Sequence, residues 1–448
     1  MERKHYKMKN KIVTLLTATV FFFTTLHAQK NQQVKQMAYA DSLRLVEIFK
    51  DLHQNPELGF MEVRTAGIVA KELKALGYQV ITGIAKTGVV GIFKNGDGPV
   101  VMYRADMDAL PVKERTGLPW SSTKTVKNED GSPTNVMHAC GHDSHITWLI
   151  GVAKIMMAIK NDWKGTLLLV AQPAEETILG ARAMVADNMY KKGVPVPDYL
   201  FGMHSKAMAV GKVENGFNER FAGTDQLDVR FTGIGGHGSA PQFTIDPVVM
   251  SATAILLYQT IISRNIAAQD AAVLTVGAVH AGVANNVIPA YADLKLNIRW
   301  FSEKIRNTLL EGIKRINEGI AISNNLPKEL YPTITMKGNA SPLVNNEAMV
   351  KRINTALATF IDPENIISNT PSIMGSEDFH HLVNHNKITV YDYLIIGTAN
   401  PGMVAKANAE GKAAPFSAHN DNYQIDLSAI PLGTVVGTMA LIELFKKQ

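Results

Sequence analysis

The spacing of apolar residues along this chain changes repeatedly between the period of a helix and that of a strand. Residues 42–53 place their large apolar side chains on one face, which predicts an amphipathic helix. Residues 65–76 have the same spacing, and Gly77 supplies the C-cap of a second helix. Residues 89–93 and 100–103 are short apolar runs typical of strands.

The same alternation continues as far as residue 203. Helical spacing returns at residues 144–159 and 177–188. Residues 166–171 and 199–203 are continuous apolar runs, as expected of strands that are buried on both faces of a parallel sheet. The order of these elements predicts an α/β fold around a mostly parallel sheet.

The pattern changes within residues 221–331. Leu227, Val229 and Phe231 alternate with polar residues, as in a strand with one buried face. The elements that follow are a helix at 247–263, strands at 272–279 and 292–298, and a helix at 303–322. This β-α-β-β-α order is that of a ferredoxin-like α+β domain.

The α/β pattern resumes after this segment. The remaining predicted elements are a helix at 345–360, a strand within 389–396 and a final helix at 430–445. We therefore expect one α/β domain, built from residues 38–220 and 332–448, that is interrupted by the ferredoxin-like domain.

The N-terminus has a different composition from the rest of the chain. Four lysines precede an apolar run at residues 12–23, and Ala28 offers a cleavage position. A membrane anchor is the alternative, but the run is shorter than the roughly 20 residues that a spanning helix needs, and it contains three threonines. We predict that residues 1–28 are a signal peptide and that the protein is exported, either to a periplasm or out of the cell.

This segment also explains the charge of the chain. The formal net charge is +5, and residues 1–28 hold five basic side chains and one acidic one. The rest of the chain is therefore close to +1, so the basic composition gives no support for nucleic-acid binding. Once the signal peptide is removed, we expect no stable membrane insertion.

The chain contains a single cysteine, Cys140, which can form no internal disulfide. Exported proteins use cysteine mainly in pairs, so an unpaired cysteine is either buried and inert or functional. Cys140 lies two residues from His138 and two from His142. A thiolate with an imidazole suits Zn, Mn, Co or Ni better than Ca or Mg. A buried cysteine beside a structural histidine is the alternative.

Charged and polar residues follow the predicted strands closely. Asp106 and Asp108 follow one strand, Glu175 and Glu176 a second, and His204 a third. In open α/β sheets the carboxyl ends of the strands converge on one crevice, so these side chains are expected to meet. One of two adjacent carboxylates can bind a metal while the other accepts a proton from water.

Each of these residues also has a structural interpretation. The paired glutamates could open an exposed acidic helix, and an aspartate after the first strand could pair with Arg104. By itself, His419 is a weak candidate for a metal ligand, because nearby histidines are rivals for that role. These rivals lie in a polar segment, where histidines are more often surface residues than ligands. Those rivals are His380, His381 and His385. His237 lies among glycines, which could form a flexible loop or expose the imidazole.

Taken together, these stretches resemble the aminoacylase/carboxypeptidase group of dinuclear metallohydrolases. Within that group, the chain is similar to the branch of hippurate hydrolase and the plant auxin–amino-acid conjugate hydrolases. The matching stretches, in order, are RADMDALP, HACGHDSH, QPAEE, FGMH, GGHGSAP, NVIP and MGSEDF. The resemblance runs from about Leu52 to the C-terminus and is highly specific.

The resemblance implies two divalent metal ions per subunit, with Mn or Zn favoured and Co or Ni possible. The implied ligands are Cys140, His142, Glu176, His204 and His419. Cys140 would bridge the two metals. Residues 221–331 would act as a lid and as the dimerisation domain of a homodimer, while 38–220 and 332–448 would form the catalytic domain.

The resemblance also implies roles for the remaining residues. Glu175 would act as general base and then as proton donor to the leaving amine, and Asp108 would support a ligand. His237 would be presented by the partner subunit's lid to the substrate carbonyl oxygen. Asn286 and Arg299 would contact the substrate from the lid.

The expected activity is hydrolysis of the amide bond of N-acyl amino acids, hippurate-like or acyl conjugates, by a metal-activated water. A metallo-dipeptidase or carboxypeptidase is the alternative, and a non-catalytic binding protein on the same scaffold is a remote one. Three departures from the branch bear on substrate preference through the pocket walls. They are Gln242 after Pro241, the pair Ser205-Lys206 after His204, and an insertion at about 400–414.

Overall fold

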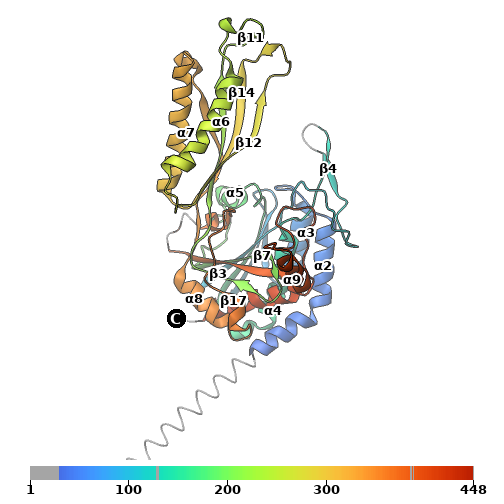
Figure 1. Ribbon diagram of the computed structural model, residues 1–448. Coiled ribbons are helices and arrows are strands. Elements are labelled where there is room, and N and C mark those ends of the chain that lie inside the picture. Colours follow the sequence, from blue (N-terminus) through green and yellow to red (C-terminus); the bar gives the residue numbers. More distant parts are fainter. Residues whose placement is uncertain (1–29, 128–130, 384–385, 387, 447–448) are drawn as a thin grey trace, which may run out of the picture. The chain divides into compact units, whose positions relative to one another are not determined.

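The computed structural model describes residues 30–446 except for 128–130, 384, 385 and 387. The predicted signal peptide lies outside the described residues. The chain divides into two compact units (Figure 1). The first unit consists of Met1–Gly216, Asn346–Thr370 and Leu382–Gln448, and the second unit of Phe217–Asn345 and Pro371–His381.

The first unit is built on an eight-stranded sheet with the order β1-β2-β6-β3-β7-β18-β8-β17. The bounds are β1 (Gln79–Ile84), β2 (Gly88–Asn95), β6 (Gly165–Gln172), β3 (Val100–Asp106), β7 (Tyr199–Ala209), β18 (Val390–Ala399), β8 (Val213–Glu214) and β17 (Ile366–Ile367). The central strands β6, β3, β7 and β18 run parallel, whereas β2 is antiparallel to both of its neighbours, β6 and β1. The predicted mostly parallel α/β sheet is confirmed.

Helices cover both faces of this sheet, and most of the predicted ones are present. They are α2 (Ser42–Gln54), α3 (Val63–Ala75), α4 (His142–Ala158), α5 (Gly180–Ala186), α8 (Glu347–Leu357), α9 (Pro401–Ala409) and α10 (Ala429–Phe445). A short hairpin joins β4 (Thr125–Lys127) to β5 (Pro133–Asn135). The helix α9 lies within the stretch that the sequence indicated as an insertion.

The helices α4 and α10 are buried over most of their lengths and pack against each other in the core. The contact depends on glycine, because a Cβ on Gly433 would lie 2.3 Å from the ring of Trp148. The indole nitrogen of Trp148 donates a hydrogen bond to the carbonyl oxygen of Ala429 at 3.1 Å. This packing fixes the start of α4, where His142 lies.

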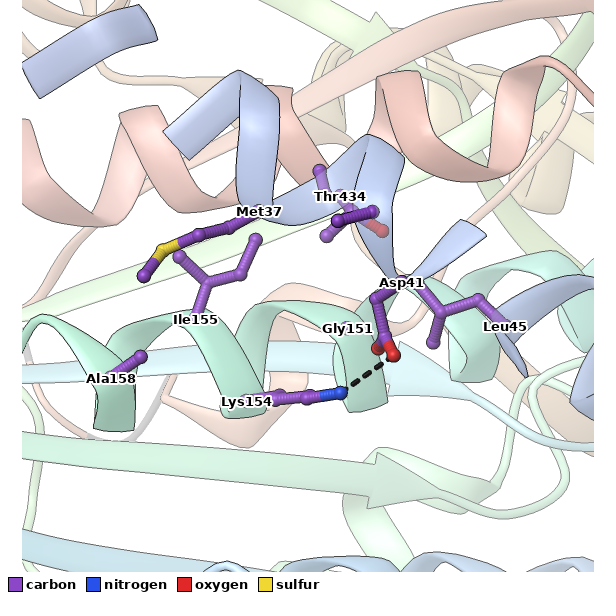
Figure 2. A pocket seen from close by; sticks show the side chains of 10 residues that line it. Met37, Asp41, Leu45, Gly151, Lys154, Ile155, Ala158 and Thr434 are labelled. Atoms are coloured by element: carbon purple, nitrogen blue, oxygen red, sulfur yellow. Dashed lines mark hydrogen bonds and ion pairs between the residues drawn. The ribbon is translucent and has the colours of Figure 1, made fainter. Parts of the chain in front are cut away.

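A cavity of about 250 Å³ lies where residues 37–45 meet α4 and α10 (Figure 2). Its wall is largely apolar and includes Met37, Leu45 and Ile155, while Lys154 forms an ion pair of 2.6 Å with Asp41 beside it. None of the candidate functional residues lines this cavity.

The second unit contains a four-stranded antiparallel sheet with the order β12-β14-β10-β15. Its elements are β10 (Gly223–Thr232), α6 (Pro247–Asn265), β12 (Ala272–Ala281), β14 (Tyr291–Trp300), α7 (Glu303–Ser323) and β15 (Thr333–Ala340). Two small pairs accompany it, β9 (Asn218–Phe221) with β16 (Leu343–Asn345) and β11 (Gly236–His237) with β13 (Val287–Ile288).

The order of strands and helices in the second unit is the ferredoxin-like one that the sequence predicted. Leu227, Val229 and Phe231 are all buried in its core beside α6 and α7, which confirms the alternating strand. Across both units, none of the helices formed by the described residues has the length and apolarity needed to span a bilayer.

Candidate metal centre

The candidate residues of the first unit gather at the carboxyl ends of β3 and β6 and along β7. Asp106 is the last residue of β3 and pairs in register with Gln172, the last residue of β6. His204 lies inside β7, which continues to Ala209, so the prediction that it follows the strand is wrong. β7 continues because β18 pairs with it beyond His204.

The loops between strands and helices bring in the other donors. Gly141 adopts a left-handed conformation with φ 84° and directs the chain from Cys140 into α4, which begins at His142. A side chain at Gly141 would be blocked, because a Cβ there would lie 2.3 Å from the hydroxyl oxygen of Ser205. The backbone N–H of His419 donates to the carbonyl oxygen of Ala139 at 2.8 Å, which ties the C-terminal loop to this turn.

Three of the candidate ligands form one group whose donor atoms lie within 4.8 Å of one another: Cys140, Glu176 and His419. Nε2 of His419 is 3.3 Å from a carboxylate oxygen of Glu176. His204 joins the group through its Nε2, which is 3.5 Å from Sγ of Cys140. The other ring nitrogen of His204 donates to the carbonyl oxygen of Ser205 at 2.7 Å, so Nε2 carries the lone pair toward the thiol.

His142 connects this group to Glu175. Its Nε2 lies 3.8 Å from Glu176 Oε1 and 3.9 Å from Glu175 Oε2. The His142 ring is fully buried, and neither of its nitrogens makes a hydrogen bond of good geometry; nor does Glu176 Oε1. Buried polar atoms are normally hydrogen-bonded, so donors that face one another in this way fit a metal ion between them.

Cys140 has the electrostatic surroundings of a thiolate ligand. Burial and the Glu176 carboxylate oppose ionisation of the thiol, but the imidazoles of His204 and His142 outweigh them and lower its pKa to about 6. A thiolate among imidazoles and carboxylates is a donor set for borderline divalent metals such as Zn or Mn. The residues present therefore fit the group that the resemblance implies.

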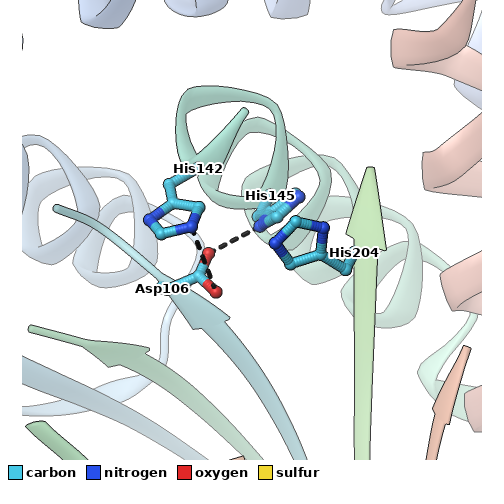
Figure 3. Close-up of side chains that lie close together, drawn as sticks. All are labelled: Asp106, His142, His145 and His204. Carbon is cyan, nitrogen blue, oxygen red and sulfur yellow. Dashed lines mark hydrogen bonds and ion pairs between the residues drawn. The ribbon is translucent and has the colours of Figure 1, made fainter. Parts of the chain in front are cut away.

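Figure 3 shows a neighbouring group of possible donors, which are Asp106, His142, His145 and His204. His145 is already engaged through both nitrogens: Nδ1 is 2.5 Å from Asp106 Oδ1, and Nε2 accepts the backbone N–H of Ser205 at 2.9 Å. Burial lowers the pKa of His145 to about 3, which keeps the imidazole neutral. His145 therefore supports the site, and His142 and His204 remain as the ligand candidates in this group.

The two aspartates after β3 have different partners. Arg104 forms a buried ion pair of 2.7 Å with Asp106, so the salt-bridge interpretation holds for that residue. Asp108 instead accepts the backbone N–H groups of Glu175 at 3.0 Å and Glu176 at 2.9 Å. Its Oδ1 also lies 3.4 Å from His142 Nδ1, beside the ligand that the resemblance implied it would support.

The paired glutamates lie on a tight turn and not on an exposed helix. α5 begins only at Gly180, and the intervening Ile178 adopts a left-handed conformation with φ 59°. The predicted helix at 177–188 is therefore shorter than expected. Glu175 is buried, with 6% of its surface exposed, and its carboxylate faces His142. A buried acid at this position is poised to exchange protons inside the site.

Ser205 belongs to the supporting structure of the site. The sequence singled it out as a pocket-wall departure, but it is buried and its hydroxyl bonds the carbonyl oxygen of Cys140 at 3.0 Å and the hydroxyl of Tyr423 at 2.8 Å. Its neighbour Lys206 points to Glu214, with an ion pair of 2.9 Å. Ser205 thus fixes the turn that carries the thiol.

His53 is a further buried residue to which sequence reasoning gave no role. Its ring lies between two carboxylates, 2.6 Å from Asp143 and 3.2 Å from Glu114. Burial opposes the charged ring, but the two carboxylates raise the pKa of His53 to about 9. Because Asp143 follows His142 in α4, this imidazolium anchors the helix turn that presents the candidate ligand. The only sequence signal was its place beside Leu52, where the resemblance to the family begins.

The remaining predicted residues belong to the second unit. His237 is exposed in β11, and its Nδ1 accepts the backbone N–H of Ser239 at 3.1 Å. Asn286 is exposed as well. It lies directly before β13, the strand that pairs with β11, and its carbonyl oxygen accepts the N–H of Gly238 at 2.8 Å. The backbone segments that carry these two exposed residues are therefore neighbours in the second unit.

Arg299 lies on β14, and its guanidinium donates to neutral acceptors. They are Asn297 Oδ1 and Ser376 Oγ, both at 2.6 Å, and the carbonyl oxygen of Met374 at 3.4 Å. Burial lowers the pKa of this guanidinium. A half-buried cation with neutral partners is suited to pair with a carboxylate.

Two of the histidines that competed with His419 are buried and not on the surface. His380 and His381 are buried, with 1% and 7% exposed, and His380 Nε2 is 2.9 Å from the hydroxyl of Ser341. The surface expectation is wrong for these two because both rings contact Ser341, whose N–H also donates to His381 Nε2 at 3.4 Å. His385 lies outside the described residues. His419 itself is 56% exposed.

Known proteins of similar sequence identify the family of this chain. The profile of the peptidase family M20/M25/M40 matches residues 102–434. The chain is 38% identical to the hippurate hydrolase of Campylobacter jejuni over 337 residues, which cover 74% of this chain and 83% of that enzyme. It is 29% identical to IAA-amino acid hydrolase ILR1-like 2 of Arabidopsis thaliana over 460 residues, covering 98% and 96%.

One solved structure is similar over most of its length. The YXEP protein of Bacillus subtilis, a dinuclear metal-binding peptidase of the M20 family, superposes with a TM-score of 0.71 at 26% identity, covering 91% of this chain and 99% of that one. The relatives include the branch that the sequence motifs indicated, which confirms the resemblance. The chain therefore belongs to the peptidase family M20/M25/M40 and is a hydrolase that acts on amide bonds.

Proposed function

We propose that this chain is an exported, metal-dependent amidohydrolase that cleaves the amide bond of N-acyl amino acids, with hippurate-like or acyl-conjugate substrates. The observation that carries the proposal is the convergence of five candidate ligands beside a buried glutamate, Glu175. The relatives named for hippurate and IAA-amino acid hydrolysis support the substrate class.

The proposed cofactor is a pair of divalent ions per subunit, with Mn or Zn favoured and Co or Ni possible. The residues that would hold them are Cys140, as the bridging ligand, with His142, Glu176, His204 and His419. When bound, the ions supply Lewis-acid activation of water and polarise the scissile carbonyl group.

Glu175 performs the proton transfers in this proposal. Its carboxylate takes a proton from the attacking water and then gives it to the nitrogen of the departing amine. The hydrogen bonds from the N–H groups of Glu175 and Glu176 to Asp108 hold the turn that carries it. The surrounding burial keeps bulk water from competing for the proton.

The second unit supplies the proposed substrate contacts. The Ser239 N–H occupies Nδ1 of His237, which places the proton of the neutral ring on Nε2, so His237 can donate to a substrate carbonyl oxygen. The resemblance implies that this donation occurs across a dimer. Arg299, with its neutral partners, would bind the carboxylate of the amino-acid portion, and Asn286 would contact the substrate beside His237.

A homodimer through the second unit is part of the proposal. α6 exposes Val249 and Leu256, with 57% and 73% of their surfaces accessible, and β12 is an edge strand of the sheet. Exposed apolar side chains beside an unpaired strand edge favour association with a second copy. Sedimentation of the purified protein tests this, and a monomer at micromolar concentration would contradict it.

Export is proposed from the sequence of residues 1–28, which has the lysines, the apolar run and the cleavage position of a signal peptide. Expression of the full chain in a bacterial host tests it. We expect the mature protein outside the cytoplasm, with Gln29 at its N-terminus. An intact N-terminus in the cytoplasmic fraction would contradict the proposal.

The substrate proposal is tested by turnover after addition of Mn or Zn, against acetyl-, benzoyl- and indolyl-acyl amino acids and a matched set of dipeptides. We expect the acyl amino acids to be hydrolysed faster. Preference for dipeptides would support the dipeptidase alternative. A non-catalytic binding role has no support, because the buried base Glu175 serves no purpose in a binder.

A further inference from the structure

A further buried carboxylate, Glu62, contacts the turn that carries Glu175. It has no exposed surface. Its Oε1 accepts the backbone N–H of Ala174 at 2.9 Å and that of Phe60 at 3.0 Å, and its Oε2 accepts the hydroxyl of Thr87 at 2.6 Å. All three donors are neutral, so hydrogen bonds alone compensate the burial of this acid.

Glu62 stands at the N-cap of α3, yet its side chain does not cap that helix. The capping is done by Glu57, which accepts the N–H groups of Arg64 at 2.9 Å and Thr65 at 2.8 Å. The side chain of Glu62 is thereby available to reach a segment more than a hundred residues away in the chain. A purely local role in starting α3 does not explain it.

The two amides that Glu62 Oε1 holds belong to strained residues. Phe60 and Ala174 both adopt left-handed conformations, with φ 61° and 51°. Residues other than glycine rarely do so unless the surrounding structure imposes it. Gly59 supports the same contact, since a Cβ there would lie 3.1 Å from Ala174 Cα. One carboxylate oxygen thus fixes both sides of this backbone contact.

The turn after β6 therefore presents three successive N–H groups to two buried carboxylates. Ala174 donates to Glu62, while Glu175 and Glu176 donate to Asp108. The direction of the Glu175 side chain depends on the backbone conformation of Ala174, the residue before it. A small rotation there would move the carboxylate away from His142.

We propose that Glu62 is a positioning residue for Glu175: by accepting the Ala174 amide, it holds the turn in the left-handed conformation that aims the Glu175 carboxylate into the site. This inference rests on the proposed role of Glu175. Glu62 itself touches neither substrate nor reacting atoms, and acts through the hydrogen bond alone.

The test compares three substitutions that separate the effect of the length of the side chain from the effect of its charge. Glu62→Gln keeps an acceptor oxygen at the same reach, and its amide group can donate to Thr87. Glu62→Asp keeps the charge but is one methylene shorter, and Glu62→Ala removes the acceptor. We expect kcat to be near the wild-type value for Gln, to fall about tenfold for Asp, and to fall about 100-fold for Ala, with KM and metal content within twofold.

Glu57→Ala is the matched control, because it also removes two hydrogen bonds to backbone amides from the same segment. We expect it to lower Tm without lowering kcat. Equal losses of kcat in Glu57→Ala and Glu62→Ala would overturn the proposal, as would a Glu62→Gln variant that is less active than Glu62→Asp. If Glu62→Ala fails to fold, the Gln and Asp variants decide the question.

A readout independent of turnover separates this inference from the proposed function. Amide hydrogen exchange in the holoenzyme reports the turn directly. We expect exchange at Ala174 and Glu175 to be at least tenfold faster in Glu62→Asp than in Glu57→Ala or Glu62→Gln. Unchanged protection there would overturn the role of Glu62, whereas altered protection in an enzyme without activity on acyl amino acids would count against the substrate proposal only.

Discussion

The candidate residues of the two units are held in opposite ways. In the first unit, His142 and Glu175 are buried. Asp108 holds the turn of Glu175 by accepting the N–H groups of Glu175 and Glu176, and its Oδ1 lies 3.4 Å from His142 Nδ1. In the second unit, His237 and Asn286 are exposed, and their hydrogen bonds are to the short segment 237–239: Ser239 N–H donates to His237 Nδ1 and Gly238 N–H donates to the carbonyl oxygen of Asn286. Arg299 is intermediate, since it is half-buried among neutral acceptors.

This difference separates two tasks. Chemistry at a metal requires donor atoms and a base held within fractions of an ångström, which a rigid, buried core can provide. Substrate selection requires groups that meet molecules arriving from solvent, and exposed loops suit that purpose. Substitutions in the first unit should therefore lower metal content or kcat, whereas substitutions in the second unit should act on KM.

The largest effect is expected for Cys140→Ala. Cys140 Sγ lies close to the donor atoms of Glu176 and His419 and also to Nε2 of His204. Removal of the thiol therefore eliminates a donor atom that lies near all three. We expect elemental analysis of the purified variant to show loss of metal, and turnover to fall to background. A variant with full metal content would contradict the role of Cys140 as a ligand.

Glu175→Gln should separate binding of the metal from catalysis. The amide keeps the shape of the side chain but cannot accept a proton, so kcat should fall by about 10²–10⁴. Metal content and KM should stay within twofold, measured by elemental analysis and steady-state kinetics. Turnover close to wild type would remove Glu175 from the mechanism.

Arg299→Met tests the second unit. Loss of a charge-assisted hydrogen bond to a substrate carboxylate should lower kcat/KM by about 10–100-fold, mostly through KM. Lys295→Met is the matched control, because this lysine lies on the same strand and pairs with Asp228 at 3.4 Å. If both variants behave alike, or if kcat alone changes in Arg299→Met, the comparison between the units breaks down.

The smallest effect is expected for His53→Gln, and it depends on pH. Because the pKa of His53 is raised to about 9 in the folded protein, the charged ring stabilises the fold fully below its unfolded value of about 6.5. That stabilisation, about 3 kcal/mol for a pKa raised from 6.5 to about 9, is lost as the pH rises from about 6.5 through about 9.

Thermal unfolding of wild type and His53→Gln between pH 6 and pH 10 measures this contribution. The groups that face the ring are Asp143 and Glu114, with His138 close enough to interact electrostatically. We expect the difference in Tm to be largest near pH 6, to shrink as the pH rises from about 6.5 to about 9, and to change no further above that. A difference that does not change with pH would show that the ring acts by packing alone.

Much of the fold could be predicted from local pattern. The apolar runs predicted β3, β6 and β7, and helical spacing predicted α2, α3 and α4. The sequence did not reveal β17, which is only two residues long, or that β7 continues past His204. Such features depend on pairing with distant strands, and hydrophobic periodicity along one segment contains no information about its partner.

The same distinction applies to the candidate site, where local motifs could be recognised in the sequence but contacts between distant segments could not. Sequence spacing and motif identity were sufficient to select Cys140, His142 and Glu176, which the structure places together. They did not reveal Glu62, because a carboxylate beside a helix start is ordinary in sequence. They also did not reveal that His145 is engaged by Asp106 and not available as a ligand.

The sequence by itself determined which chemical groups this protein contains and the order in which they follow the strands. Residue type and the spacing of apolar residues are local properties that can be read along the chain. Only the tertiary structure decided which of those groups are ligands, which are supports and which are exposed. That assignment depends on hydrogen bonds between segments such as Glu62 and Ala174, which lie far apart in the chain and meet only when the sheet is assembled.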